Sequence, residues 1–305
     1  GFAHDLILNR EDIIGYTVRS MIPSRYPSDG SSVSSFAGYL NWIYKVNDRL
    51  TLNGGLRMTA SKITARWNET ALVDKLLSRV DLLSDALTYT FAMTYRPNQK
   101  WQLNSLISSG FRNPNIDDIG KIRESSGILL VPNSFLKPEY AYTFETGIKF
   151  TAPNKINYID LRGFTTLVSR HIVRSDFIVF SDLSTPDKNT ILYNGEEVVT
   201  QANKNLGNRS IYGGSIEGRW VLSDPLEIGG GITYTAADEN SSYGPMPSIA
   251  PLFGTFTLSH KSKNLKTLLI WKFSDSKDPS KYSWGGEDGL YETPLVDPTA
   301  NDEIN

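Results

Sequence analysis

Three histidines, His4, His171 and His260, are the residues with the clearest potential for acid–base or metal chemistry. A histidine beside a carboxylate can act as a general base, and several histidines together can hold a metal ion. The strand pattern described below places His260 beside a short turn and His171 at the opposite end of another strand, so a shared metal site is not expected. No order of Ser, His and Asp residues suggests a catalytic triad. We therefore expect a protein that is not an enzyme, without catalytic residues, metal or cofactor.

Acidic clusters and glycine runs are the next candidates for ligand binding. Asp117-Asp118 and Asp238-Glu239-Asn240 could bind calcium, but neither matches a calcium-loop pattern, so we expect solvated loop carboxylates. The glycine runs Gly54-Gly55, Gly213-Gly214 and Gly229-Gly230-Gly231 lack the following helix of a phosphate-binding loop. All three fall within strand patterns, where glycine eases curvature or makes room for an aromatic ring.

Composition excludes several further classes. The 305 residues contain 31 Lys and Arg against 33 Asp and Glu, without the basic excess that nucleic-acid binding needs. The absence of cysteine excludes disulfides, thiolate metal sites and cysteine nucleophiles within this sequence. The longest apolar runs, such as residues 268–271, are far shorter than the roughly 20 residues of a membrane-spanning helix.

Strict alternation of apolar and polar residues is the main structural signal, and it is typical of strands with two different faces. It is clearest at residues 87–96, where Tyr89, Phe91 and Tyr95 share one face and Thr88, Thr90 and Thr94 share the other. It recurs at residues 142–150 and 212–222. Weaker examples lie at 36–45, 50–59, 101–110, 156–167, 226–235, 252–260 and 265–273. The pattern predicts about ten antiparallel strands.

The connections between these strands alternate in length. Short polar turns are expected at 47–49, 97–99, 153–154, 223–225 and 261–264. Long connections are expected near 68–85, 111–140, 177–208 and 237–250. This alternation is typical of outer-membrane β-barrels, whose periplasmic turns are short and whose extracellular loops are long. Two segments differ: residues 1–33 suggest a preceding loop with a strand remnant, and residues 70–83 have helical spacing that predicts a short helix in an extracellular loop.

The two predicted faces differ in a way that favours a membrane barrel over a soluble barrel or sandwich, which would also alternate. Aromatic residues gather on the apolar faces near strand ends, as lipid-interface girdles require. They are Phe36, Trp42, Tyr44, Tyr89, Tyr95, Trp101, Tyr142, Phe150, Trp220, Tyr234, Trp271 and Phe273. The opposite faces carry charges expected to face a lumen holding water or a polar plug. They include Arg57, Glu145, Lys149, Asp160, Arg162, Glu217 and Arg219.

A register can be predicted for one hairpin. If Pro153-Asn154 is a turn closed by Ala152 and Lys155, Glu145 lies opposite Arg162 and Gly147 lies opposite Asp160, with both pairs on the lumenal side. Proline is unfavourable in a tight two-residue hairpin turn, so a shift of register remains an alternative.

Two ordered motifs resemble the signature of TonB-dependent outer-membrane receptors. The first is Gly110-Phe111-Arg112-Asn113-Pro114-Asn115 followed by Ile116-Asp117-Asp118. The second is Asn133-Ser134-Phe135-Leu136-Lys137-Pro138-Glu139 followed by Phe144-Glu145-Thr146-Gly147. The motif residues carried over from the family are Gly110, Phe111, Arg112, Pro114, Asn115, Leu136, Lys137, Pro138, Glu139, Glu145 and Gly147. The form of the match is similar to receptors of Bacteroidota-type bacteria.

The resemblance implies a 22-stranded barrel in the bacterial outer membrane, filled by an N-terminal plug. It implies active import of a large or scarce solute, such as a ferric siderophore, haem, a cobalamin or an oligosaccharide. The implied partners are TonB with ExbB and ExbD acting through the plug, outer-membrane lipid, the solute, and a surface lipoprotein. Nucleic acid is not an expected partner.

The sequence departs from this family pattern in extent. It contains no plug, no TonB-contacting segment and no final strand ending in an aromatic residue. An open ten-stranded sheet would leave two unpaired edges in lipid, so we expect residues 1–305 to be part of one larger barrel domain, nearer its C-terminal end.

Two rival functions remain at this point. One is a self-contained ten-stranded barrel acting as a surface protease or adhesin, for which His171 is the available histidine at the outer rim. The other is a passive porin, which needs no plug and does not explain the two motifs. The sequence does not identify the solute or the loop residues that bind it.

Overall fold

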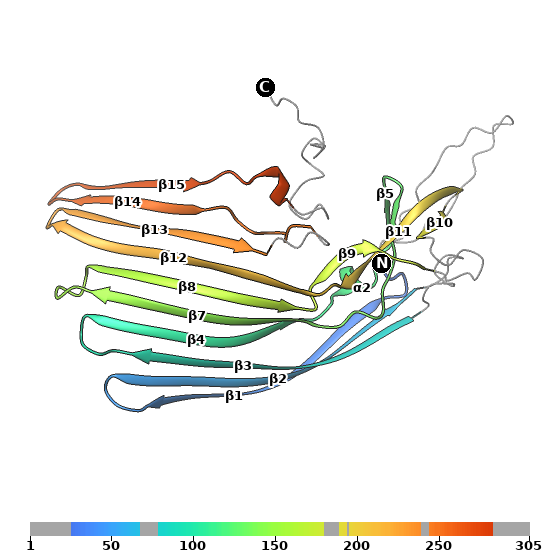
Figure 1. Ribbon diagram of the computed structural model, residues 1–305, viewed down its shortest axis with the longest axis horizontal. Helices are drawn as coiled ribbons and strands as arrows, with labels where there is room; N and C mark the ends of the chain where they lie inside the picture. The colour runs from blue at the N-terminus through green and yellow to red at the C-terminus, as the bar shows by residue number, and fades with distance from the viewer. Residues whose placement is uncertain (1–25, 68–78, 180–188, 194, 239–243, 283–305) are drawn as a thin grey trace, which may run out of the picture.

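A computed structural model describes residues 26–67, 79–179, 189–193, 195–238 and 244–282. Ten long antiparallel strands form one curved sheet in which each strand pairs with its neighbours along the chain (Figure 1). They are β1 (Ser31–Lys45), β2 (Leu50–Arg66), β3 (Arg79–Tyr95), β4 (Trp101–Arg112), β7 (Glu139–Thr151), β8 (Tyr158–Ser169), β12 (Asn208–Ser223), β13 (Leu226–Ala237), β14 (Phe253–Lys261) and β15 (Lys266–Ser274). The predicted all-β, antiparallel, ten-stranded wall is confirmed.

The ten-stranded sheet is open. β1 and β15 are the first and last strands in the sheet order, and in the part of the chain that the structure describes they do not pair with each other. Among the same residues no helix is long and apolar enough to cross a membrane.

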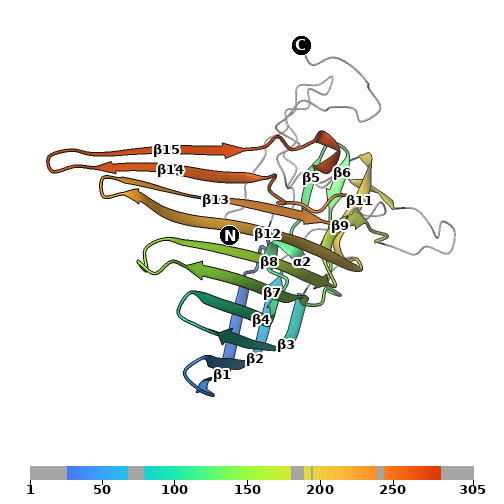
Figure 2. The same ribbon diagram turned by 60° about the vertical axis from the view of Figure 1, so that its left-hand side comes forward.

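The two ends of this sheet differ, as the connection lengths predicted. The short connections β1–β2, β3–β4, β7–β8, β12–β13 and β14–β15 all lie at one end, which we call the turn end and which is on the left in Figure 1. The long connections lie at the other end, which we call the loop end. Both views show the shorter elements gathered there (Figure 2).

Strand register assigns every residue of the sheet to one of two faces. Following the partners from β1 to β15 places all the aromatic residues predicted to face lipid on the same face, which we call the apolar face. It is exposed along its length, with Phe91 and Phe144 about half exposed at 45% and 46%. All the charged residues predicted to face the lumen lie on the opposite face, which we call the polar face. The strand register therefore groups these residues into the same two sets that sequence alternation predicted.

The long connections contain a second, smaller sheet that the sequence analysis did not predict. Its strands are β10 (Thr190–Tyr193), β11 (Glu196–Asn205), β6 (Ile128–Leu130) and β5 (Arg123–Ser125), in that order, with β9 (Ile172–Asp176) pairing with β11. A short helix, α2 (Ile116–Ile119), precedes it, and a single 3-10 turn, η1 (Pro279–Lys281), follows β15. We call β5, β6, β9, β10, β11 and α2 the small-sheet module.

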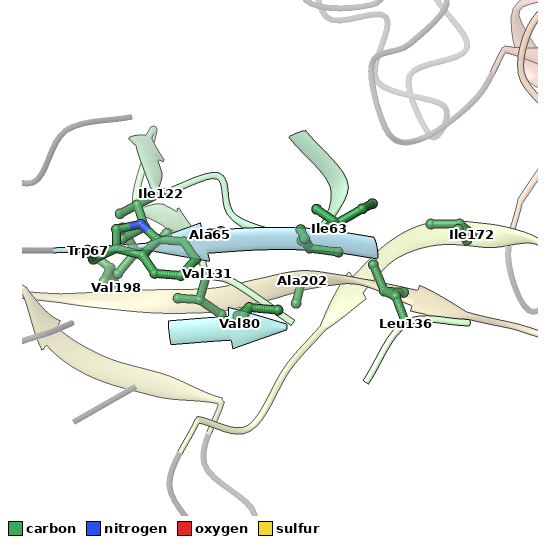
Figure 3. Close-up of a cluster of buried hydrophobic side chains, with 12 residues drawn as sticks. Ile63, Ala65, Trp67, Val80, Ile122, Val131, Leu136, Ile172, Val198 and Ala202 are labelled. Atoms are coloured by element: carbon green, nitrogen blue, oxygen red, sulfur yellow. The ribbon is translucent and has the colours of Figure 1, made fainter. Parts of the chain in front are cut away.

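The small-sheet module packs against the polar face at the loop end. Ile63 and Ala65 of β2 and Val80 of β3 are at most 2% exposed. They form one apolar cluster with residues of the module, including Leu129 and Val198 (Figure 3). At this end the polar face therefore carries apolar side chains. Their burial between the sheet and the module stabilises the packing of the module against the sheet.

Two local predictions need correction. The helix predicted at residues 70–83 is wrong for residues 79–83, which belong to β3, while residues 70–78 lie outside the described residues. Val80 and Leu82 pair with Ala65 and Ile63 of β2, and this strand pairing overrides the helical spacing. Residues 31–33, predicted to lie in a loop with a strand remnant, begin β1, and residues 1–25 lie outside the described part.

Glycines in the strands make room for aromatic rings, as predicted. A Cβ atom at Gly54 would lie 2.2 Å from the Trp42 ring, and one at Gly213 would lie 2.8 Å from the Phe164 ring. Each ring lies over a glycine of the neighbouring strand, where a larger residue would collide with it.

Candidate functional site

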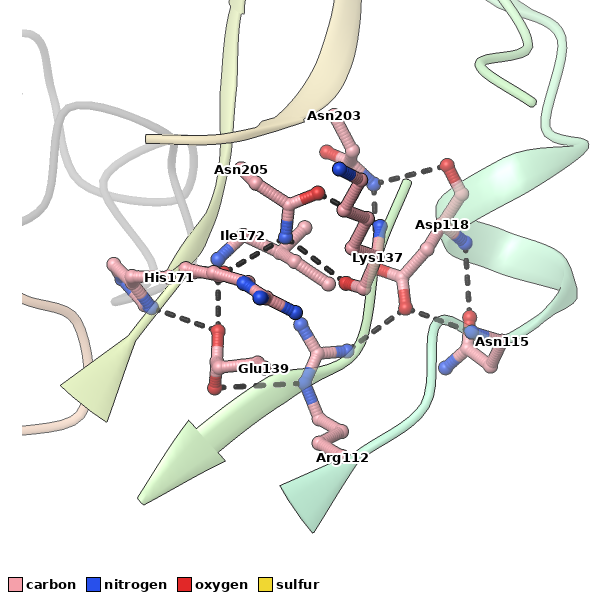
Figure 4. A network of polar contacts seen from close by, with 10 residues as sticks. Arg112, Asn115, Asp118, Lys137, Glu139, His171, Ile172, Asn203 and Asn205 are labelled. Carbon is pink, nitrogen blue, oxygen red and sulfur yellow. Dashed lines mark hydrogen bonds and ion pairs between the residues drawn. The ribbon is translucent and has the colours of Figure 1, made fainter. Parts of the chain in front are cut away.

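The two sequence motifs meet at the loop end of the polar face. The first motif ends β4 and the second begins β7, and the antiparallel pairing of these strands makes Arg112 and Glu139 register partners. Around this pair a network of hydrogen bonds joins β4, α2, β7, β9 and β11 (Figure 4). We call it the motif network.

Arg112 connects the two motifs directly. Its Nη1 lies 2.8 Å from Oδ2 of Asp118, and its Nε lies 3.8 Å from Oε1 of Glu139. The carboxylate of Asp118 is largely buried and that of Glu139 similarly so, at 13% and 16% exposed. The guanidinium therefore bridges two shielded carboxylates, which would repel each other without it.

Residues 113–118 build the short helix that holds Asp118. Asn115 is the N-cap of α2: its side chain accepts a hydrogen bond from Asp118 N, and Asp118 Oδ2 accepts one from Asn115 N, which completes a capping box. Pro114 is fully buried. Asn113 reaches across the polar face, donating from Nδ2 to Ser61 Oγ and accepting from Ser84 Oγ. The motif therefore ties α2 to β2 and β3 as well as to β4.

Glu139 anchors β9. Its Oε2 accepts a hydrogen bond from Ile172 N at 2.7 Å and lies 3.0 Å from Nδ1 of His171. His171 is buried, at 8% exposed, and its Nε2 has no hydrogen-bond partner among the described residues. A histidine and a carboxylate do meet at this end of the sheet, but both are enclosed within a structural contact.

The remainder of the second motif anchors β11. Asn205 accepts a hydrogen bond from Lys137 N and donates from Nδ2 to the Lys137 carbonyl, so the two residues bind each other reciprocally. Leu136, which precedes them, is 2% exposed and belongs to the apolar cluster. Asn203 donates from Nδ2 to Asp118 Oδ1 at 3.3 Å. β11 is therefore held by the Asp118 side chain of the first motif and by the Lys137 main chain and Leu136 side chain of the second.

The structure separates the other motif residues from this network. Phe111 lies on the apolar face, 6.3 Å from the Tyr140 ring, and a Cβ atom at Gly110 would meet nothing within 4 Å. Pro138 directly precedes β7. Glu145 and Gly147 lie further along β7 towards the turn end, where Gly147 makes room for Arg162.

The charged residues of the polar face form a second group of contacts. Arg162 binds Asp160 through two nitrogens, each at 3.2 Å, and lies 3.5 Å from Glu145. Tyr158 donates to Glu217 at 2.9 Å, and Lys149 lies 4.2 Å from the centre of the Tyr158 ring. Two further contacts lie on this face. Arg219 forms an ion pair with Glu227, and Arg57 donates a hydrogen bond to Thr59. Glu145, Asp160, Arg162 and Arg219 thus form ion pairs within the wall, whereas the contacts of Arg57, Lys149 and Glu217 are with uncharged groups.

The predicted register of the β7–β8 hairpin is wrong by two residues. Glu145 lies opposite Phe164, Gly147 opposite Arg162, and Lys149 opposite Asp160. The cause is a longer turn: Ala152 N donates to the Asn157 carbonyl, and Asn154 accepts hydrogen bonds from Ile156 N and Asn157 N. A shift of two residues keeps every side chain on its face, so the face assignment survives.

The candidate ligand sites of the sequence have other roles. Asp118 belongs to the capping box, Asp117 lies 3.6 Å from Lys121, and Asp238 binds the buried Arg209. His260 lies on the apolar face of β14, and His4, Glu239 and Asn240 lie outside the described residues. Among the described residues, no group of three or more His, Cys, Asp or Glu side chains is placed to hold a metal ion.

Sequence reasoning gave no structural role to Asn113, or to His171, Asn203 and Asn205 of the motif network. Asn113 occupies the variable position of its motif, and His171 was considered only for a metal site and for catalysis. Asn203 and Asn205 lie on β11, 85 residues from Asp118 and 68 from Lys137 respectively. No local pattern signals such partners, although Val198, Thr200 and Ala202 alternate as in a buried strand.

Comparison with known proteins supports the resemblance. The model of the family described as TonB dependent receptor-like, beta-barrel, matches residues 7–299. The hemophore receptor HasR of Serratia marcescens, solved with its hemophore HasA and heme, is 16% identical with a TM-score of 0.64, covering 85% of this chain and 46% of that one. The copper transporter OprC is 14% identical with a TM-score of 0.61, covering 80% and 35%.

A third solved structure extends the likeness. The alcaligin outer-membrane receptor FauA of Bordetella pertussis is 15% identical with a TM-score of 0.52, covering 80% of this chain and 38% of that one. None of the curated proteins compared with the chain matches it. The chain spans less than half the length of these three solved structures, and at such identities they show the fold alone. Because the family model covers nearly the whole sequence, this chain belongs to the TonB-dependent receptor β-barrel family.

Proposed function

We propose that the chain is part of the barrel of a receptor that imports a scarce solute across the bacterial outer membrane, driven by TonB. The observation that carries this proposal is the small-sheet module, which the motif network holds against the polar face at the loop end. A module packed inside a wall narrows its opening, which suits a receptor that binds its solute before release and does not suit an open pore.

The proposed orientation follows from the two faces. The exposed aromatic and aliphatic side chains of the apolar face contact lipid, and the paired charges of the polar face line the lumen and meet a plug. The loop end lies outside the cell. The extracellular connections then comprise the residues between β2 and β3, between β4 and β7, between β8 and β12, and between β13 and β14, close to the predicted 68–85, 111–140, 177–208 and 237–250.

The solute belongs to the classes that the sequence suggested: a ferric siderophore, haem, a cobalamin or an oligosaccharide. We propose that the protein has no catalytic role, that TonB, ExbB and ExbD act on it through a plug elsewhere in the polypeptide, and that residues 1–305 form part of one barrel domain. A surface lipoprotein and a Bacteroidota-type source remain parts of the same proposal.

The structure bears on the two rival functions. A surface protease needs an accessible histidine with its carboxylate, whereas His171 is buried and Glu139 already accepts from Ile172 N and lies beside Arg112. A self-contained ten-stranded barrel needs its edge strands to pair, and β1 and β15 are unpaired with each other among the described residues. A passive porin needs no module across its mouth.

The function is tested by uptake into cells. Strains lacking the receptor gene, lacking TonB, or lacking neither are supplied with each labelled solute in turn at a concentration that limits growth. We expect accumulation of one solute class to require both the receptor and TonB, and to stop when a protonophore removes the proton gradient. Receptor-dependent entry of small solutes that continues without TonB would instead identify a porin.

A further inference from the structure

Among the described residues, the apolar face has an open hollow that spans β12, β13, β14 and β15. Its floor is formed by Gly218 and Gly230, which are register partners on β12 and β13. Ile216 and Ile232 bound it towards the loop end, Trp220 towards the turn end, and Phe256 on the side of β14. The hollow has a volume of about 560 Å³, and the atoms exposed on its lining are apolar.

The depth of the hollow is fixed by the backbone. A Cβ atom at Gly230 would lie 2.4 Å from the Thr255 carbonyl oxygen, and one at Gly218 would lie 3.1 Å from the Tyr158 carbonyl oxygen. Both neighbours are main-chain atoms of adjacent strands, which cannot rotate away as a side chain can. The wall around the glycines stays exposed, with Ile216 at 44% and Ile232 at 42%.

The position of the hollow identifies its surroundings. The apolar face of β12 runs from Leu222 through Trp220, Gly218, Ile216 and Gly214 to Tyr212. This stretch has the roughly 9 to 11 residues with which a tilted strand crosses the hydrocarbon core. Gly218 lies within it, between Trp220 on the turn-end side and Ile216 on the loop-end side, so the hollow reaches into the stretch expected to cross hydrocarbon.

We propose that this hollow, which we call the glycine hollow, binds one acyl chain of an outer-membrane phospholipid. The volume lies in the range of about 300 to 1,000 Å³ typical of small-molecule sites. The hollow is continuous with the apolar face proposed to contact lipid, and side chains of β12, β13, β14 and β15 surround a bound chain on several sides. Dispersion contacts summed over such an enclosure favour a flexible hydrocarbon chain over a partner that needs polar recognition.

The proposal rests on the membrane orientation given above and goes beyond solute import. It is tested with the full-length receptor in nanodiscs of phosphatidylethanolamine and phosphatidylglycerol. A fraction of the phospholipid carries a photoactivatable diazirine within its acyl chain. After illumination and digestion, we expect cross-linked peptides to be enriched at residues 216–232 and 253–273 over the equally exposed apolar face of β1–β4.

Two variants make the result specific. Ile216→Trp fills the hollow while keeping the face apolar, and it should lower labelling of residues 216–232 and 253–273 to the level of β1–β4. Ile107→Trp introduces the same ring on β4, where Ile107 is similarly exposed at 47%, and should leave the labelling unchanged. Should Ile216→Trp not insert, Ile232→Trp tests the same hollow. Uniform labelling of the apolar face in the wild type, or unchanged labelling in the filled variant, would overturn the proposal.

A photoreactive amino acid placed at position 216 shows whether the occupant of the hollow is a lipid or a protein. A phospholipid adduct supports the acyl-chain site. A receptor-to-receptor or receptor-to-protein adduct would show that the hollow is a protein interface and would refute it. Labelling of the apolar face by water-soluble reagents would instead contradict the membrane orientation itself, so the two failures are distinguishable.

Discussion

Arg162 and Glu145 lie diagonally across β7 and β8, with the guanidinium Nη1 3.5 Å from the carboxylate Oε1, although they are not register partners. Asp160 is the closer partner of Arg162, and its side chain is only 6% exposed, against 35% for Glu145. The diagonal contact is possible because Arg162 lies opposite Gly147, two residues from Glu145, and both side chains lie on the polar face.

This arrangement predicts unequal effects of removing the two carboxylates. We expect Asp160→Asn to lower the free energy of unfolding by about 1 to 3 kcal/mol, because it removes a charge-assisted hydrogen-bond pair at a buried site. Glu145→Gln should cost about 0 to 1 kcal/mol, as for a solvated ion pair. Urea unfolding of the full-length receptor measures both. A double-mutant cycle with Arg162→Met that gives Glu145 the larger coupling energy would contradict this ranking.

The face assignment predicts opposite accessibility of neighbouring residues. Spin labels at Phe91 and Phe144 should respond to a lipid-soluble relaxation agent, and labels at Thr90 and Glu145 should respond to a water-soluble one. Phe144→Arg places a charge in hydrocarbon and should cost about 2 to 4 kcal/mol if the site lies near the bilayer midplane. Equal response of the two sets to both agents would show that the faces are wrongly assigned.

The pairing of Gly54 with the Trp42 ring predicts a steric penalty. Gly54→Ala should destabilise the barrel by about 1 to 3 kcal/mol, because its Cβ atom would overlap the Trp42 ring and force the ring out of its position. Gly38→Ala is the matched control, since a Cβ atom there meets nothing within 4 Å. The added substitution Trp42→Ala should recover part of the loss at Gly54. Equal costs at Gly54 and Gly38 would exclude the steric explanation.

The sequence predicted the long wall well because a two-faced strand imposes a period of two on every residue. It placed strand ends less well. β2 continues to Arg66, beyond the predicted residue 59, because Ile63 and Ala65 pack against the small-sheet module and not against lipid or lumen. At that end the polar face carries apolar residues, and the contrast between faces that marked the strand disappears.

The small-sheet module could not be predicted in the same way. Its strands are short, and β6 pairs in parallel with β11, whose partner residues Ile128 and Val199 are far apart in the sequence. The motif network likewise joins residues whose separation exceeds any local repeat. The resemblance supplied the motif residues, but only the structure assigns most of them to a brace between the wall and the module.

The role of the motif network can be tested at Glu139. Glu139→Ala removes the acceptor for Ile172 N and the partner of His171, so both would be left unsatisfied in a buried environment at a cost of about 1 to 3 kcal/mol. We expect faster amide hydrogen exchange in β9 and β11, with β12–β15 unaffected. Glu196→Ala, on the exposed start of β11, is the control. Unchanged exchange in β9 would show that Glu139 does not anchor the module.

The proposed orientation can be tested by chemical labelling, because the sequence contains no cysteine that would react in the background. Phe135 is 82% exposed at the loop end, on a turn held by Asn133, whose Oδ1 accepts from Phe135 N. Asn98 lies in the β3–β4 turn at the opposite end. In intact cells expressing full-length receptor free of other cysteines, Phe135→Cys should react with a membrane-impermeant maleimide and Asn98→Cys should react only after the outer membrane is permeabilised. Both substitutions replace exposed residues, but Asn98 Oδ1 accepts hydrogen bonds from Lys100 N and Trp101 N, so heat-dependent gel migration must first show that Asn98→Cys forms a folded barrel. Labelling of Asn98→Cys in intact cells, with protection of Phe135→Cys, would place the turn end outside and reverse the proposed direction of transport.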